Sequence, residues 1–309
     1  MSLKLEQLHH LVAVVEHGSL RAASRRLGVP QPALTRSIRA LERQLGAELF
    51  TRASQGMTLT ELGRRFHHRA SAIVHEMRRA HDELAQGGGD EHGQVVVALS
   101  ILPHLLMLPR ALPVFRRRYP NVRLHLIEGL FPDVEERLRT GQVDFYLGAA
   151  PRRLPAPGLR VRPLFAHPRS VVCHPGHPLR EARSLELLVE AAWATTAIDY
   201  DAERDLGEIF AQYGLRPPRV MLQARTATSL VAALTGDLLA LVPMQWHQSP
   251  QFRGLLQAVP VSEPLPPVEI ALLTRDGLPM TPAAEYLCDV LLRELPAPAS
   301  PPQVSGLIA

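Results

Sequence analysis

Side chains that can pair with DNA bases recur along one face of the segment from Gln31 to Leu45. Gln31, Thr35, Arg36 and Arg39 fall at helical spacing on the side opposite the apolar residues. A glutamine can pair with adenine, an arginine can pair with the O6 and N7 atoms of guanine, and a threonine can contact a thymine methyl group or a phosphate. The pattern predicts an amphipathic helix whose polar face enters the major groove of double-stranded DNA.

Two shorter helices and tight turns precede this segment. Residues 5–17 place apolar side chains at helical spacing, and Ser19 can cap a second helix over residues 20–27. Gly28 tolerates the positive φ angle of a turn between two helices. The apolar face of the third helix consists of Leu34, Ile38, Leu41 and Leu45. The whole segment therefore predicts a helix–turn–helix.

Residues 49–60, with the sequence LFTRASQGMTLT, predict a small two-stranded wing that turns at residues 54–56. Arg52 would then enter a minor groove or hold a phosphate. The alternative is an ordinary helical bundle whose arginines only solvate its surface, and for any single arginine this alternative is the commoner case.

A long helix is expected from about residue 60 to Gln86, because Thr58 and Glu61 have the spacing of a capping box. Its apolar residues recur at alternating steps of four and three, a period of about 3.5 residues that is typical of a coiled-coil seam. These residues are Leu62, Phe66, Ala70, Ile73, Met77, Ala80 and Leu84. A seam here would pair two DNA-binding modules; the alternative is a helix that packs only on its own domain. Residues 87–89, all glycine, are expected to end the helix and form a hinge.

After the hinge, short apolar strands alternate with helices, which predicts parallel α/β sheets. The expected strands are 95–99, 122–127, 143–149, 170–174, 194–198, 220–223, 238–242 and 268–274, and the expected helices are 104–119, 133–140, 185–191, 202–213, 227–235 and 283–294. The last strand and helix would return to complete the first of two lobes. The chain would cross between the lobes near residues 165–169 and 264–267.

Ligands of such sheets bind beyond the carboxyl ends of the strands or between lobes. Ser100 and Ile101 follow the first strand, while Arg225, Thr226 and Thr228 lie near a helix start, where an anion can bind. The alternative for the latter group is plain helix capping at the surface. The apolar partners at the other strand ends are Phe131, Tyr200 and Met244. Hydroxyls and one arginine beside apolar side chains predict a small organic acid as effector.

The composition limits the class of protein. The chain has 309 residues, 46% of them hydrophobic and 21% charged, which suggests two or three domains. It contains no apolar run of about 18 residues and no signal-peptide pattern, so we expect a cytoplasmic protein without a membrane span. Residues 1–89 carry 13 Lys and Arg against 8 Asp and Glu, whereas the remainder carries 21 against 22. This asymmetry predicts a polyanionic partner for the N-terminal module only.

Several chemical functions lack their motifs. Cys173 and Cys288 fall in different expected lobes, so buried thiols are favoured over a redox-sensitive disulfide. Cys173, His174 and His177 fall short of a tetrahedral metal set, and their segment is expected to be an exposed turn. No nucleophile elbow, P-loop, zinc-protease or paired-carboxylate motif occurs. We therefore expect no catalytic residues, no metal and no cofactor, and a protein that is not an enzyme.

The order and spacing of the N-terminal residues resemble those of the LysR-type transcription regulators over some sixty residues. The matching pieces are Ala22-Ala23…Leu27, Gln31-Pro32-Ala33-Leu34, Ile38…Leu41-Glu42, Leu45-Gly46…Leu49-Phe50…Arg52 and Leu59-Thr60…Gly63. The resemblance implies that Gln31, Pro32, Thr35 and Arg36 contact bases or the DNA backbone, and that Arg52 is the wing arginine. One departure is Pro30, which stands where the family commonly has a capping serine and therefore removes a capping hydroxyl.

The resemblance also covers the C-terminal body, where it is consistent in order and length. It implies a two-lobed effector domain similar to a periplasmic binding protein, with Ser100 donating a hydroxyl to the effector. It further implies a homodimer or homotetramer that binds promoter DNA, with RNA polymerase as a candidate partner. Two other functions remain open: an architectural DNA-binding protein without an effector, and a solute-binding protein that serves a transporter.

The expected architecture follows from these segments. An all-α winged helix–turn–helix occupies residues 1–59, a linker helix with its hinge occupies 60–89, and an α/β effector domain occupies 90–295. Within the effector domain, lobe I comprises 90–166 and 268–295, and lobe II comprises 167–267. Residues 296–309, rich in Pro, Ala and Ser, are expected to be disordered.

Overall fold

The computed structural model describes residues 3–53, 56–87, 92–131, 133–151, 157–196 and 202–295. The chain divides into two compact units, one built mainly from residues 1–90 and the other mainly from residues 91–309. None of the described helices is long and apolar enough to cross a membrane. The expected tail at 296–309 lies outside the described residues.

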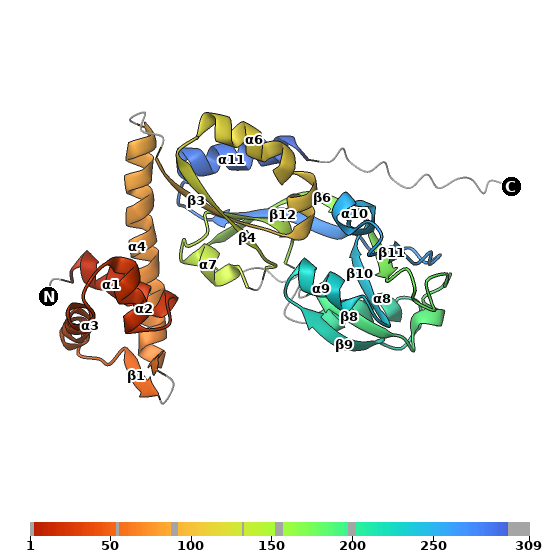
Figure 1. Ribbon diagram of the computed structural model, residues 1–309, viewed down its shortest axis with the longest axis horizontal. Coiled ribbons are helices and arrows are strands. Elements are labelled where there is room, and N and C mark those ends of the chain that lie inside the picture. The colour runs from red at the N-terminus through yellow and green to blue at the C-terminus, as the bar shows by residue number, and fades with distance from the viewer. Residues whose placement is uncertain are drawn as a thin grey trace. The chain divides into compact units, whose positions relative to one another are not determined.

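The first unit is a helical domain with a two-stranded wing (Figure 1). Its elements are α1 (Leu5–Glu16), α2 (Leu20–Leu27), α3 (Gln31–Leu45), β1 (Phe50–Ala53), β2 (Gly56–Leu59) and α4 (Glu61–Gly87). The two strands pair antiparallel. The core between α1, α3 and α4 is formed by Leu8, Leu11, Val12, Ile38, Leu41, Leu49 and Ala70. The helix boundaries expected for α2 and α3 are confirmed, because glycines with positive φ angles end both helices.

Helix α4 begins differently from the expected capping box. The hydroxyl oxygen of Thr60, not Thr58, accepts a hydrogen bond from the Gly63 N–H at 2.8 Å. Thr58 lies in β2, where its backbone pairs with Thr51. The capping-box prediction was wrong because the wing extends to Leu59 and leaves Thr60 as the last residue before the helix.

The apolar stripe of α4 is divided between two environments. Ala70 is buried in the core of the first unit, and Phe66 packs against that core. Leu62, Ile73, Met77 and Leu84 are 51–79% exposed. The helix therefore packs on its own domain along one face and presents apolar side chains on another.

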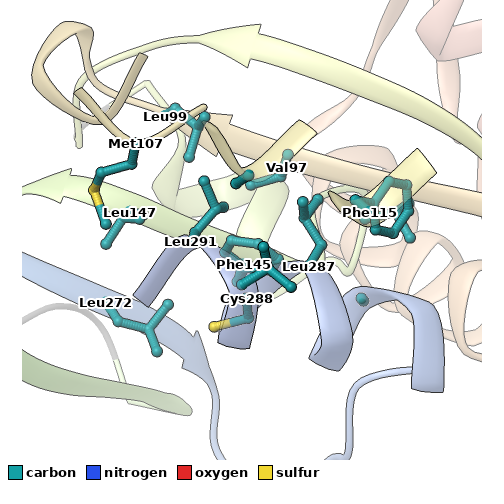
Figure 2. Close-up of a cluster of buried hydrophobic side chains, with 14 of the residues drawn as sticks. Val97, Leu99, Met107, Phe115, Phe145, Leu147, Leu272, Leu287, Cys288 and Leu291 are labelled. Carbon is teal, nitrogen blue, oxygen red and sulfur yellow. The ribbon is translucent and has the colours of Figure 1, made fainter. Parts of the chain in front are cut away.

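The first sheet of the second unit has the strand order β4-β3-β5-β12-β6. Its strands are β3 (Gly93–Leu99), β4 (Val122–Glu128), β5 (Phe145–Ala149), β6 (Leu159–His167) and β12 (Val268–Arg275). Helices α5 (Ile101–Leu106), α6 (Leu108–Arg118) and α11 (Pro282–Arg293) pack on one face, and α7 (Glu135–Arg139) packs on the other. Figure 2 shows Phe115 of α6 and Leu287, Cys288 and Leu291 of α11 beside side chains of β3 and β5.

The second sheet has the order β11-β7-β10-β8-β9. Its strands are β7 (Arg169–Cys173), β8 (Ala192–Thr196), β9 (Arg219–Ala224), β10 (Leu238–Pro243) and β11 (Gln257–Ala258). Its helices are α8 (Ala202–Ala211), α9 (Ala227–Ala233) and α10 (Gln245–Gln248), with 3-10 turns at Glu186–Leu188 and Pro250–Phe252. Its cores are centred on Trp193 with Phe210, and on Leu230 with Trp246.

Both sheets contain parallel pairs, as expected, but each also contains antiparallel pairs and is therefore mixed. Strand β12 pairs antiparallel with β5 and β6, and β7 pairs antiparallel with β10. Strand β6 was not predicted, because Pro163 interrupts its alternation. A proline is tolerated there because β6 is an edge strand and its pairing with β12 shifts register beside Pro163.

Two expected helices also differ. The helix predicted at 104–119 starts at Ile101 and breaks at Met107, since the next helix carries Pro109 in its first turn. The helix predicted at 185–191 is only the 3-10 turn Glu186–Leu188. Four side chains of the segment 185–191 pack into the core around Trp193, so apolar spacing there reflects burial and not a longer helix.

Candidate DNA interface and effector cavity

Helix α3 presents a polar face to solvent and an apolar face to the core. Gln31, Pro32, Arg36 and Arg39 are exposed, whereas Leu34, Ile38 and Leu41 are buried. No carboxylate among the described residues pairs with Arg36 or Arg39, so both guanidinium groups remain available. These four are among the six residues expected to contact DNA; Thr35 is half-buried, and the side chain of Arg52 lies outside the described residues.

The angle between α2 and α3 is fixed by backbone geometry and two short contacts. Gly28 has a φ of 67°, in the left-handed region that favours glycine. The Ser24 hydroxyl donates to the carbonyl oxygen of Val29 at 2.6 Å, which ties α2 to the turn. At the other end of α2, the Ser19 hydroxyl oxygen accepts from the Ala22 N–H at 3.1 Å. These contacts position the first turn of α3.

Pro30 does not shift the start of α3. Its carbonyl oxygen accepts from the N–H groups of Ala33 and Leu34 at 2.9 and 3.1 Å, so the helix begins at Gln31 without a capping side chain. The Thr35 hydroxyl donates to the Gln31 carbonyl oxygen at 2.9 Å. Thr35 can therefore contact DNA through its methyl group or accept a hydrogen bond from a base. Its hydroxyl hydrogen is not available for a phosphate.

The wing is attached to α3 by Glu42, a residue not predicted to have this role. One carboxylate oxygen of Glu42 accepts from the N–H groups of Leu49 and Phe50 at 2.9 and 3.2 Å. Its place in the run Leu41-Glu42 was a signal, but a surface glutamate in a helix gives no sign of its partner. Arg52 lies in β1, where its backbone pairs with Met57; its side chain is outside the described residues.

A cavity of about 490 Å³, open solvent at its mouth included, lies in the second unit. The ends of β3, β4 and β5 contribute to its wall, as do α9, α10 and the start of β12. Its lining residues are Ser100, Ile101, Leu102, Glu128, Gly129, Leu130, Ala149, Thr196, Arg225, Thr226, Ala227, Pro243, Trp246, Val268 and Ile270. Most of these side chains are apolar, as is usual for a small-molecule site.

Four of the eight expected effector residues line this cavity: Ser100, Ile101, Arg225 and Thr226. Phe131 is instead 2% exposed and packs against Tyr146 with ring centroids 6.0 Å apart, so it belongs to the core. Thr228 is exposed on α9, and Met244 is half-buried outside the lining. Tyr200 lies outside the described residues. Glu128 and Trp246 line the cavity but were missed, because each reaches it only through the arrangement of the strands.

Ser100 is held by its surroundings. Its N–H donates to the Leu147 carbonyl oxygen at 3.0 Å, and it is buried at the N-terminus of α5. Gly148 packs tightly behind it, since a Cβ atom added there would lie 2.7 Å from the Cβ of Ser100 and 2.4 Å from the Tyr146 hydroxyl. The strand end therefore offers Ser100 in one fixed position.

Arg225 and the first N–H group of α9, which suggested an anion site, are both paired with carboxylates of the chain itself. Arg225 pairs with Asp133 at 2.8 Å. The first N–H of α9, from Ala227, donates to Glu128 at 2.6 Å. Thr226 caps α9 by accepting from the Ser229 N–H at 3.1 Å. The arginine and the helix start were predicted from the sequence, whereas the two carboxylates that contact them were not.

Both cysteines, and one of the two histidines next to Cys173, are buried. Cys173 and Cys288 are free and buried, and burial raises their pKa to about 11 and about 12. His177 is buried, so the expectation of an exposed turn was wrong for this residue; its Nδ1 accepts from the Leu179 N–H at 3.0 Å. Among the described residues, no group of three or more potential metal ligands occurs.

Comparison with known proteins covers both units. Residues 88–296 match the family model of the LysR substrate binding domain, and residues 5–64 match that of the bacterial regulatory helix-turn-helix protein, lysR family. The chain is 28% identical over 296 residues to the SDS degradation transcriptional activation protein of a Pseudomonas species, covering 94% of this chain and 96% of that protein. It is 34% identical to the HTH-type transcriptional regulator CfxR of Cupriavidus necator, covering 60% of this chain and 58% of that protein.

Solved structures share the fold over nearly the whole chain. Full-length OxyR from Pseudomonas aeruginosa, in a variant form, has a TM-score of 0.67 at 22% identity and covers 94% of this chain and 95% of its own. CbnR, complexed with its target DNA, has a TM-score of 0.65 at 22% identity and covers 95% of this chain and 100% of its own.

Proposed function

The chain belongs to the LysR family of DNA-binding transcriptional regulators, and on this premise we propose that α3 binds an operator while the cavity of the second unit binds a small-molecule effector. The DNA-binding role rests on the exposed polar face of α3, with its two unpaired arginines. Base contacts would come from Arg36, Arg39 and Gln31, and from the methyl group of Thr35, while Pro32 and the wing residue Arg52 would contact the backbone.

We propose that the protein acts as a homodimer or homotetramer in the cytoplasm, where its target DNA lies. The exposed apolar residues of α4 supply a surface for pairing two chains. Pairing would hold two copies of α3 on two half-sites, so that the binding free energies of both add. Contact with RNA polymerase is a further proposal, and it applies to a regulator that activates transcription.

For the effector site, we propose the residues that line the cavity, including Ser100, Ile101, Arg225 and Thr226. An organic acid, the effector expected from the sequence, would have to displace Asp133 from Arg225 or approach the like charge of Glu128. Effector binding would change how the two sheets meet and so shift the population of DNA-binding states.

Binding of the purified protein to its own upstream intergenic DNA tests the first part. Fluorescence anisotropy against scrambled DNA at two salt concentrations should show preferential binding that weakens as salt rises. Arg36→Ala should weaken specific binding by about tenfold or more, because one bidentate base contact contributes roughly 1–3 kcal/mol. Arg253→Ala removes the same charge from an exposed loop of the second unit and serves as the control.

Equal, weak binding of the wild type to both DNAs would argue against sequence-specific recognition and favour an architectural protein. Equal losses in Arg36→Ala and Arg253→Ala would show that net charge, and not the polar face of α3, determines binding.

A further inference from the structure

The cavity carries one charged group that no cation neutralises among the described residues. Glu128, exposed at the end of β4, accepts a hydrogen bond from the Ala227 N–H, and no described arginine, lysine or histidine pairs with its carboxylate. Arg225, the cationic side chain in the described lining, is paired with Asp133. One arginine between two carboxylates gives this part of the cavity a net charge of about −1.

The rest of the described lining suits an uncharged, apolar body. Ile101, Leu130, Val268 and Ile270 supply aliphatic surface, and Trp246 supplies an indole ring. Trp246 is buried, and its Nε1–H has no acceptor among the described residues. At 2% exposure, and with the ring of Phe252 packed against it, the indole contributes apolar surface to the wall.

Resting on the effector function proposed above, we propose that the ligand of this cavity is an organic cation: an amine on an apolar body, whose ammonium group pairs with Glu128. An acid of the same shape would meet the like charge of Glu128. It would also have to compete with Asp133 for Arg225. An ammonium group meets an opposite charge without displacing either contact.

Glu128 also connects the cavity to both sheets of the domain. It lies at the end of a strand in the first sheet and hydrogen-bonds to α9, which packs on the second sheet. A cation on Glu128 therefore acts at a contact between the two sheets. This links occupancy of the cavity to the relative arrangement of the two lobes.

Three matched series of probes test the charge of the ligand on the full-length protein. The probes are alkylamines, alkanoates and alkanols of about four to ten carbons, with their phenyl-capped counterparts, so that body size and head-group charge vary independently. Affinities are measured by tryptophan fluorescence and thermal shift near neutral pH, where amines are protonated. Amines are expected to bind about tenfold more tightly than carboxylates on the same body, as a charge-assisted hydrogen bond allows.

Two variants assign the preference to a residue. Glu128→Gln keeps an oxygen that can accept the Ala227 N–H, so the fold should persist, and circular dichroism checks this. It should weaken amine binding by about tenfold and leave the alkanols within about twofold. Asp133→Asn removes the neighbouring carboxylate that pairs with Arg225; it should weaken amine binding by less than about threefold and strengthen carboxylate binding.

Carboxylates that bind as tightly as amines, amine affinity that survives Glu128→Gln, or no binding in any series would overturn the inference. Operator anisotropy with the same compounds separates it from the proposed function. If carboxylates alone bind and alter DNA binding, the effector function stands and the cation is wrong. If amines bind through Glu128 but DNA binding never changes, the ligand class stands and the effector function is wrong.

Discussion

Single positions in the first unit are constrained by close backbone packing. Gly63 lies in α4 where a Cβ atom would fall 2.0 Å from the carbonyl oxygen of Leu49. The same Leu49 donates its N–H to Glu42, so this point joins the wing, α3 and α4. The glycine in the run Leu59-Thr60…Gly63 is thus required by packing and not by contact with DNA.

Gly63→Ala is expected to lower the free energy of unfolding by about 2–3 kcal/mol, because the added methyl group must displace backbone and not a flexible side chain. Gly87→Ala is a matched control in the same helix, since a Cβ atom there meets nothing within 4 Å. It should be neutral or stabilise by up to about 1 kcal/mol. Urea titration of both variants measures the difference, and equal effects would contradict the packing argument.

His10 links stability to pH. It is buried in α1 with its Nδ1 2.8 Å from the Ser37 hydroxyl of α3. Burial lowers its pKa below the usual 6.5, against an opposing effect of Glu6, and His9 lowers it further. The unfolded chain therefore binds a proton at a higher pH than the folded chain does. The stability from neutral His10 is present above about pH 6.5 and is lost as the pH falls below it.

His10→Asn keeps a polar group near Ser37 but cannot titrate. The free energy of unfolding of the wild type should decrease on going from about pH 7.5 to about pH 5.5, and the decrease should be smaller in the variant. His67, His167 and His247 also have pKa values lowered by burial and contribute in the same direction, so the comparison between the two proteins isolates His10. Identical slopes would exclude a role for His10.

At the scale of elements, the apolar residues of α4 form two surfaces, one packed on its own domain and one exposed. The sequence pattern had predicted them as a single coiled-coil seam. Gly63 and Ala70 face the core of the first unit, while Leu62, Ile73, Met77 and Leu84 are exposed. Exposed apolar residues repeated over a long helix are unfavourable in water unless another surface covers them. A second copy of α4 is the partner that the proposed dimer supplies.

Replacing Ile73 and Met77 together by glutamate should shift the protein toward monomer and weaken operator binding by about tenfold or more, because two half-sites would no longer be held together. Sedimentation analysis and operator anisotropy measure the two effects. Leu187→Glu, at an exposed leucine of the second unit, should change neither. A double variant that stays dimeric would place the dimer contact elsewhere.

At the scale of the whole molecule, the two cysteines lie in separate cores. Cys288 packs between α11 and the first sheet (Figure 2), and Cys173 packs in the core of the second sheet. The raised pKa of each thiol keeps it protonated at neutral pH, and burial blocks access. A redox response through these residues would require each core to open.

Neither cysteine should react with a thiol reagent in the native protein at about pH 8, and both should react in denaturant. Mass spectrometry of labelled peptides assigns each site, and intermediate denaturant concentrations show whether the two cores open together. A disulfide formed between Cys173 and Cys288 by peroxide under native conditions would contradict this prediction.

The sequence by itself determined the helices of the DNA-binding unit. Gly28 and Gly46, the cap Ser19 and the apolar spacing of α3 are local signals, and each acts within a few residues. The alternating strands and helices also indicated two lobes. Strand β6, with its proline, and the short 3-10 turn at Glu186–Leu188 were not predicted, because strand pairing and burial overrode local preference.

Only the tertiary structure determined which side chains line the cavity and how they pair. Glu128 and Ala227 are 99 residues apart in the chain, and Asp133 meets Arg225 across a similar interval. Such contacts depend on the order of strands in two mixed sheets, which no local pattern specifies. The sequence therefore predicted part of the cavity wall, whereas the charge of that wall followed only from how the strands are brought together.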